Sequence, residues 1–263
     1  MGIPPLIAHR LGRAYGPDSS RTALAGALAA GADGLEADVC LTADRELVLL
    51  HDPLLSLGTT LDGWAHERPS TAILGARLRD RRGDPTEERP LTLDELLGAT
   101  PPDLPIQVEV KAHADRDLAR LTALTVCERY RRSPQRRRIE LISFHSTACA
   151  TAAAHGFRSR LVIWSDYAPE ALAAWAHRRR VSGVSIESFL LTSHLVRVMR
   201  LAGLSVNTGT VNEAALLERV IPLEPDAVCT DRPGELRKEL EGSNATAPPA
   251  AAASRGVPAS LLA

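Results

Sequence analysis

The chain has 263 residues, of which 44% are hydrophobic and 24% are charged, a composition typical of a globular protein with a substantial core. A net charge of −1 and an aromatic content of 3% argue against nucleic-acid binding, which usually relies on a basic surface and clustered aromatic residues. No apolar run reaches the length of about 18 residues that a transmembrane span needs.

Two further features concern the cellular compartment. The chain starts MGIPPLIAHR and lacks the basic start and apolar stretch of a secretory signal. The cysteines are widely spaced and form no Cys-x-x-Cys pair, as is typical of buried free thiols in a reducing compartment: Cys40, Cys127, Cys149 and Cys229. We therefore expect a cytoplasmic location.

Short β-rich segments alternate with alanine- and leucine-rich segments of helical spacing along most of the chain. The predicted strands are 6–10, 34–41, 105–111, 139–144, 160–165, 183–188, 204–210 and 226–231. The predicted helices are 20–30, 115–131, 146–155, 169–179, 192–202 and 212–220, with a further helix start at the capping box of Thr92 and Glu95. Eight strands, each followed by a helix or by the chain end, predict a (β/α)8 TIM barrel of the α/β class.

The alternation is interrupted between residues 45 and 90. A turn at 42–46 followed by an extra strand at 46–50 predicts a hairpin, and the Gly/Arg/Pro-rich stretch at about 53–90 predicts a small insertion after the second strand. We expect one barrel domain over residues 1–241. Residues 242–263 are rich in Ala and Pro without hydrophobic periodicity, which predicts a disordered tail.

In such a barrel, functional residues lie at the C-terminal ends of the strands. The polar residues at those positions are His9, Arg10, Glu36, Asp38, His51, Glu109, Lys111, Ser143, His145, Glu187, Asn207 and Asp231. Glu36 and Asp38 are two positions apart on one strand, so their carboxylates project from the same face. Together with Glu109 and in the absence of a thiolate, they favour a hard divalent cation, Mg²⁺ or Ca²⁺, over zinc.

The other residues at this rim fit the same chemistry. His9 and His51 are suited to acid and base catalysis near neutral pH. Arg10 and Lys111 are suited to binding a phosphate. Each feature alone is unspecific, because an isolated histidine is more often structural and paired acids are common on solvated strands. Their combination indicates phosphodiester cleavage.

Several segments together resemble one known family. IAHRLGRAYGPDSS, GADGLEADVCLTADRELVLLHD, IQVEVK and CTDRP are similar in order and spacing to motifs of the glycerophosphodiester phosphodiesterase family, over about residues 5–233 and most strongly over 5–53. The resemblance implies a TIM barrel with an insertion after the second strand. It also implies a site with metal ligands Glu36, Asp38 and Glu109, a catalytic pair His9 and His51, and phosphate-side residues Arg10 and Lys111.

The sequence departs from the family pattern at four places. Leu11 replaces the glycine after His-Arg, and Pro-Asp-Ser-Ser at 17–20 replaces Pro-Glu-Asn-Thr. His145 stands where an acid is usual, and Gly209 where a tryptophan is usual. The metal and acid-base residues that the resemblance implies are intact, so we expect catalysis with an unusual, bulkier alcohol. Gly209 would leave space beside the site, and His145 would add a donor or a positive charge.

Three hypotheses follow. The first is metal-dependent hydrolysis of glycerophosphodiesters to an alcohol and glycerol 3-phosphate. The second is a related phosphodiesterase, either a phospholipase D-like lyase that stops at a cyclic phosphate or a pathway-specific enzyme. The third is a non-catalytic barrel that binds phosphodiesters, for which loss of an acid or a histidine would be expected. The expected partner is a small-molecule phosphodiester, and the oligomeric state stays open.

Overall fold

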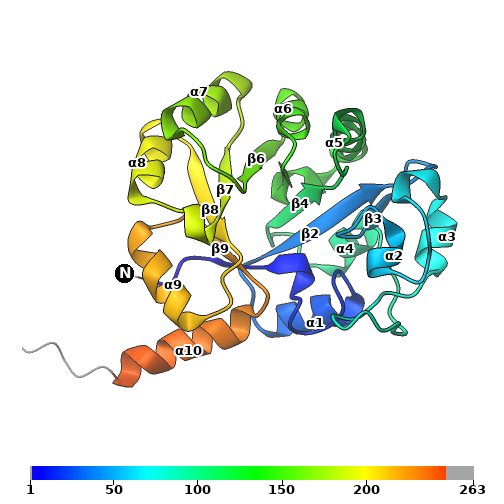
Figure 1. Ribbon diagram of the computed structural model, residues 1–263, viewed down its shortest axis with the longest axis horizontal. Helices are drawn as coiled ribbons and strands as arrows, with labels where there is room; N and C mark the ends of the chain where they lie inside the picture. Colours follow the sequence, from blue (N-terminus) through cyan, green and yellow to red (C-terminus); the bar gives the residue numbers. More distant parts are fainter. Residues whose placement is uncertain (1, 247–263) are drawn as a thin grey trace, which may run out of the picture.

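Eight parallel strands form a closed barrel in the computed structural model, which describes residues 2–246 (Figure 1). The strands pair in the order β1-β2-β4-β5-β6-β7-β8-β9, and β9 pairs with β1. Their bounds are β1 Leu6–Ala8, β2 Gly34–Leu41, β4 Ile106–Val110, β5 Ile139–Ser143, β6 Arg158–Ile163, β7 Gly183–Glu187, β8 Ser205–Gly209 and β9 Ala227–Thr230. The predicted TIM barrel is confirmed.

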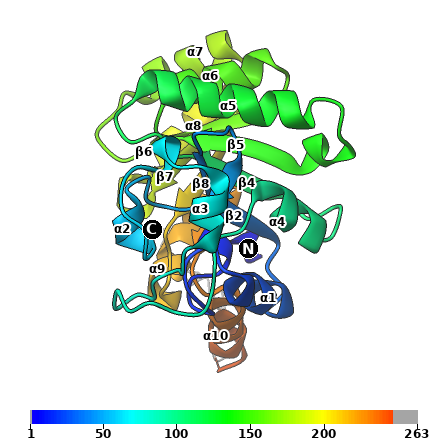
Figure 2. The same ribbon diagram turned by 90° about the vertical axis from the view of Figure 1, so that its right-hand side faces the viewer.

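Helices connect successive strands and cover the outside of the barrel (Figures 1 and 2). They are α1 Arg21–Ala29, α4 Leu93–Ala99, α5 Arg116–Tyr130, α6 Ser146–Ala154, α7 Pro169–Arg179, α8 Ser193–Leu201, α9 Ala214–Val220 and α10 Pro233–Thr246. Local signals explain several starts. Thr92 and Glu95 form the predicted capping box of α4, and the Thr192 side chain caps α8.

The interruption after β2 consists of a hairpin followed by the predicted insertion. Strand β3 (Leu47–Leu49) pairs antiparallel with β2 across the predicted turn, and α2 (Leu55–Gly58) and α3 (Ser70–Gly75) follow. This segment buries a small hydrophobic cluster of its own, which includes Leu50, Leu55 and Ile73. The rest of the chain buries two larger clusters between the barrel and its helices.

Two predicted boundaries need correction. Strand β1 ends at Ala8 rather than residue 10, because His9–Leu11 form a 3₁₀ turn in which Arg10 and Leu11 have positive φ values of 48° and 64°. The predicted disordered tail begins at Gly242, but α10 continues to Thr246. Residues 247–263 of that tail lie outside the described residues. All four cysteines are free, and Cys229 is only half-buried.

Strand register places the polar residues at a common level. Asp38 on β2 is paired with Glu109 on β4, and Glu36 with Gln107. The amide of Leu50 donates to the carbonyl of Asp38 at 3.1 Å, so the hairpin delivers His51 to the same end of the barrel. Between residues 2 and 246, no helix combines the length and the apolar character needed to cross a membrane.

Candidate active site

Three buried carboxylates meet inside the C-terminal end of the barrel. One oxygen from each of Glu36, Asp38 and Glu109 lies within 4.8 Å of the others. Glu36 Oε1 and Asp38 Oδ2 have no hydrogen-bond partner, although both are buried. Buried polar atoms are normally paired. Two carboxyl oxygens without hydrogen-bond partners beside a third carboxylate are therefore the arrangement that a divalent cation would satisfy.

The electrostatics of the cluster agree with this geometry. Burial and the neighbouring carboxylates Asp38 and Glu109 raise the pKa of Glu36 well above its ordinary value. Burial is also the main reason why the pKa of Glu109 is raised, while Lys111 opposes that shift. The pKa of Asp38 is lowered despite its burial, because Lys111, His51 and Arg10 favour its charged form.

Two cations border the carboxylates. Lys111 Nζ lies 2.7 Å from Glu109 Oε1 and 3.3 Å from Asp38 Oδ1. Arg10 donates its backbone amide to Glu36 at 2.8 Å and its Nη1 to Asp18 at 2.6 Å. Burial alone would lower the pKa of both cations, but the surrounding carboxylates raise it. Both side chains therefore remain charged beside the cluster.

His9 is held by a carboxylate from the other end of the chain. Its Nδ1 lies 2.7 Å from Oδ1 of Asp231, the residue that directly follows β9. Asn212 supports Asp231 twice, donating from Nδ2 to Oδ2 at 2.9 Å and accepting the Asp231 amide at 2.8 Å. Burial would raise the pKa of Asp231, but the hydrogen bond with His9 and its charge lower it. An ionised Asp231 accepts only, so Nδ1 carries the proton and Nε2 is left to act.

His51 has an equivalent partner next to it in the sequence. Its Nδ1 lies 3.0 Å from Asp52 Oδ1, which again leaves Nε2 available. The hydrogen bond to His51 is the main reason why the pKa of Asp52 is lowered. Both histidines thus have a carboxylate at Nδ1 that fixes the ring orientation and the tautomer.

One cavity of about 250 Å³ brings most of the predicted site together. It is lined by His9, Arg10, Glu36, Asp38, His51, Glu109, Lys111 and Gly209, together with Gln107, Ile142, Phe144, Val162, Ser185, Ile186, Glu187, Thr210 and Cys229. Of the nine residues predicted from the sequence, only His145 lies outside this cavity. Glu187 adds a further carboxyl group to the cavity wall, and burial raises the pKa of this group.

His145 borders an adjoining cavity of about 340 Å³, which shares His51, Glu109, Lys111 and Phe144 with the first. Its Nε2 lies 2.6 Å from the backbone carbonyl of His113. Nε2 therefore donates to that carbonyl, which leaves Nδ1 as the ring nitrogen that could face a ligand.

Gly209 is needed for a reason that the sequence did not reveal. A Cβ atom at this position would lie 2.6 Å from Cys229 Cβ and 3.1 Å from the Cys229 carbonyl oxygen. A side chain here would force β8 and β9 apart, so a Gly209→Trp substitution would distort the barrel as well as fill space. Gly209 lines the cavity through its backbone, but a side chain at this position would point toward β9.

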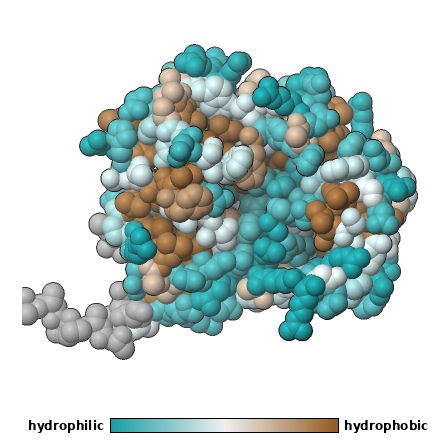
Figure 3. All heavy atoms as spheres, viewed as in Figure 1, coloured by the Kyte–Doolittle hydropathy of each residue, from teal (hydrophilic) through white to brown (hydrophobic). Residues whose placement is uncertain are grey.

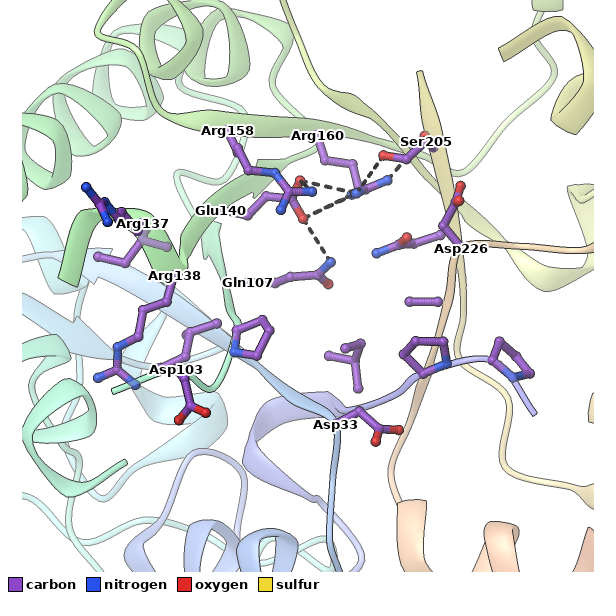
Figure 4. A pocket seen from close by; sticks show the side chains of 18 of the residues that line it. Asp33, Asp103, Gln107, Arg137, Arg138, Glu140, Arg158, Arg160, Ser205 and Asp226 are labelled. Atoms are coloured by element: carbon purple, nitrogen blue, oxygen red, sulfur yellow. Dashed lines mark hydrogen bonds and ion pairs between the residues drawn. The ribbon is translucent and has the colours of Figure 1, made fainter. Parts of the chain in front are cut away.

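A larger cavity, about 870 Å³, lies at the opposite end of the barrel (Figure 4). Most of its charged side chains have partners. Arg160 contacts Glu140 and Ser205, and Gln107 donates to Glu140 at 3.1 Å. Polar residues at the N-terminal end of a TIM barrel normally serve stability. We therefore place the active site in the smaller cavity.

Comparison with known proteins identifies the family. The model of the Glycerophosphoryl diester phosphodiesterase family matches residues 9–235. The chain belongs to this family. As a member it is an enzyme of the glycerophosphodiester phosphodiesterase class, and the matched residues contain every predicted site residue.

Relatives of this phosphodiesterase have similar length. The uncharacterized protein YqiK of Bacillus subtilis is 28% identical over 87% of this chain and 95% of its own length. The probable glycerophosphodiester phosphodiesterase 2 of Mycobacterium tuberculosis is 28% identical over 78% of each chain.

Solved structures share the fold of this phosphodiesterase. A putative glycerophosphoryl diester phosphodiesterase from Silicibacter pomeroyi aligns with a TM-score of 0.79 and 22% identity over 92% of this chain and 94% of its own. An Oleispira antarctica phosphodiesterase, solved with its product sn-glycerol-3-phosphate, aligns with a TM-score of 0.76 and 22% identity over 91% of this chain and 97% of its own.

Sequence reasoning missed the supporting groups of this phosphodiesterase. Asp231 was listed at a strand end without a role, and Asn212 was seen only as the start of the helix predicted at 212–220, although together they hold His9. Asp52, which follows His51 in the sequence, was given no role. Arg81 of the insertion approaches Asp231 Oδ2 at 3.5 Å. The CTDRP motif was the available signal for Asp231.

Proposed function

We propose that this protein hydrolyses glycerophosphodiesters to an alcohol and glycerol 3-phosphate, with a divalent cation held by Glu36, Asp38 and Glu109. The observation that carries the proposal is the single cavity shared by three buried carboxylates and two histidines, each oriented by a carboxylate. Family membership and the product bound to the Oleispira relative support the substrate class.

The carboxylate cluster fits Mg²⁺ or Ca²⁺. It offers oxygen ligands only and contains buried oxygens without partners. A bound cation would neutralise charge on the phosphoryl oxygens. Arg10 and Lys111 border the same cavity and contribute fixed positive charge toward the phosphate.

The two histidines divide the proton transfers. One Nε2 accepts a proton from the nucleophile, and the other Nε2 donates a proton to the leaving alkoxide. Asp231 and Asp52 keep the second ring nitrogen of each histidine protonated, so each Nε2 can carry out its part. The family resemblance implies that the nucleophile is the glycerol 2-hydroxyl, which forms a cyclic phosphate that water then opens. Which histidine acts as the base stays open.

Phosphorus NMR of the reaction products tests the proposal. Purified protein would be incubated with glycerophosphocholine in excess chelator and then after addition of Mg²⁺ or Ca²⁺. Glycerol 3-phosphate that appears only with metal supports hydrolysis. A cyclic phosphate as the final product supports the lyase alternative. An unchanged spectrum with every metal and across a panel of glycerophosphodiesters supports a binding protein. A cytoplasmic location stays a prediction from the sequence.

A further inference from the structure

The mouth of the active site has two chemically different halves. The half formed by β1, β2 and β4 carries the histidines, the carboxylates, Arg10 and Lys111. On the half formed by β5, β6 and β7, the cavity wall includes the apolar side chains Ile142 and Val162, together with Ser185. Among the described residues that line the cavity, Glu187 is the ionisable side chain on this second half.

Three exposed aromatic side chains follow the strands that form this wall. Phe144 follows β5, Trp164 follows β6 and Phe189 lies in the 3₁₀ turn after β7. Their exposed fractions are 43%, 66% and 76%, respectively. The chain has only three phenylalanines and three tryptophans, so half of them stand exposed at three neighbouring strand ends. We call Phe144, Trp164 and Phe189 the aromatic rim.

The rim is part of an ordered surface. The Tyr167 hydroxyl donates to the Leu190 carbonyl at 2.8 Å, which ties the loop after β6 to the turn after β7. Trp164 and Phe189 are thereby carried by connected segments. Phe144 borders both the catalytic cavity and the adjoining one, and Trp164 borders the adjoining one. Figure 3 shows one face of the molecule, on which a teal hollow lies between brown groups to its left and right.

A large exposed apolar group beside a site usually marks contact with an apolar part of a ligand. Here the charged half suits the phosphodiester, whereas the rim offers a phosphate no positive charge. We propose that the preferred substrate is an amphiphile, a phosphodiester in which one alcohol carries a long hydrocarbon chain, and that this chain lies along the aromatic rim. The proposal rests on the proposed phosphodiesterase function and narrows its substrate class.

Two homologous substrate series test the proposal and show which alcohol carries the chain. One series is the ethyl, butyl, hexyl and octyl esters of glycerol 3-phosphate, and the other is glycerophosphocholine with 1-acyl chains of increasing length. Both are used below their micelle concentrations. In at least one series kcat/KM should rise about twofold for each added methylene. Burying a methylene fully would raise kcat/KM about fourfold, and an open rim buries about half of the surface of each methylene.

A double variant and a matched control assign the effect to the rim. Trp164→Ser combined with Phe189→Ser should reduce the ratio of long-chain to short-chain kcat/KM at least tenfold. Leu201→Ser changes an equally exposed apolar side chain, 83% exposed at the end of α8, and should leave that ratio unchanged. Cleavage of the shortest esters with no chain-length dependence in either series would overturn the inference and leave the proposed function standing.

Fluorescence gives a readout that does not depend on turnover. Tryptophan emission should shift to shorter wavelength when the octyl ester of glycerol 3-phosphate is added to the wild type. This shift should be lost in Trp164→Ser. Absence of the shift would overturn the inference whether or not the protein is active. Absence of activity would refute the proposed function, independently of the shift. The same shift with phosphatidylcholine vesicles alone, or on raising the protein concentration alone, would assign the rim to a membrane surface or to a second copy instead.

Discussion

Replacing Asp231 with asparagine should impair His9 without removing any atom that could contact the substrate. The substitution keeps the shape of the side chain but gives it an amide nitrogen. Asn212 cannot adapt, because its oxygen accepts from the Asp231 amide and the Thr230 hydroxyl while its Nδ2 donates to Asp231 Oδ2. The new amide is therefore expected to present its oxygen to Asn212 and its NH₂ group to His9.

An NH₂ group facing Nδ1 favours the wrong histidine tautomer. Nδ1 must then accept, so the proton moves to Nε2. A neutral ring of this tautomer can no longer act as a base at Nε2, and a protonated ring that acts as the acid loses its charged partner at Nδ1. A hydrogen bond to a charged group contributes roughly 1.5–3 kcal/mol. Loss of that stabilisation in the transition state corresponds to a fall in kcat of about 10- to 150-fold.

The assay compares kcat and KM for a glycerophosphodiester in the wild type and Asp231→Asn. Asp226→Asn is a matched control, because Asp226 accepts the Val206 amide at 2.6 Å in the wall of the cavity at the opposite end of the barrel. The account predicts a lower kcat with little change in KM for Asp231→Asn and an unchanged kcat for the control. Equal kcat values for wild type and Asp231→Asn would refute the orienting role of Asp231.

Three further predictions concern metal binding, acid stability and backbone packing. Glu36→Gln should abolish the rise in melting temperature that Mg²⁺ or Ca²⁺ gives the wild type, without lowering the melting temperature in chelator; a retained metal effect would exclude Glu36 as a ligand. Hydrogen bonds from Thr42 and Ser70 hold the pKa of Asp44 at about 2, below its ordinary value of 3.8. Denaturation by urea should therefore show Asp44→Ala to be less stable than the wild type at pH 7, with the difference shrinking as the pH falls below about 4; a difference independent of pH would contradict this. Gly183→Ala should destabilise the fold by about 3 kcal/mol, because its Cβ would lie 2.1 Å from the Ser205 carbonyl oxygen, whereas Gly98→Ala in α4 has open space and should stabilise by about 0.5–1 kcal/mol; similar effects of the two changes in thermal denaturation would contradict the packing at Gly183.

The sequence predicted the barrel because its strands and helices differ in hydrophobic period and in their caps. It predicted the cluster of Glu36, Asp38 and Glu109 because the C-terminal ends of parallel strands meet at one rim, and the register of β2 and β4 places Asp38 beside Glu109. The turn at His9–Leu11 was missed, because its positive φ values occur at residues other than glycine, where the sequence carries no signal.

Long-range partners were also beyond prediction from one sequence. Asp231 and His9 are 222 positions apart, and only closure of the barrel between β9 and β1 brings them together. The reason for Gly209 depends likewise on the close approach of β9. The exposed aromatic rim could not be distinguished from core, because phenylalanine and tryptophan after a strand are usually buried.

Turnover of His9→Ala and His51→Ala tests the central claim most directly. Release of glycerol 3-phosphate from a glycerophosphodiester would be measured with saturating metal, with His155→Ala as the control because His155 lies at the end of α6 outside both cavities. We expect each active-site variant to lose at least about 100-fold in kcat while folding normally, and His155→Ala to keep wild-type turnover. Near-wild-type turnover in either His9→Ala or His51→Ala would contradict catalysis by two histidines.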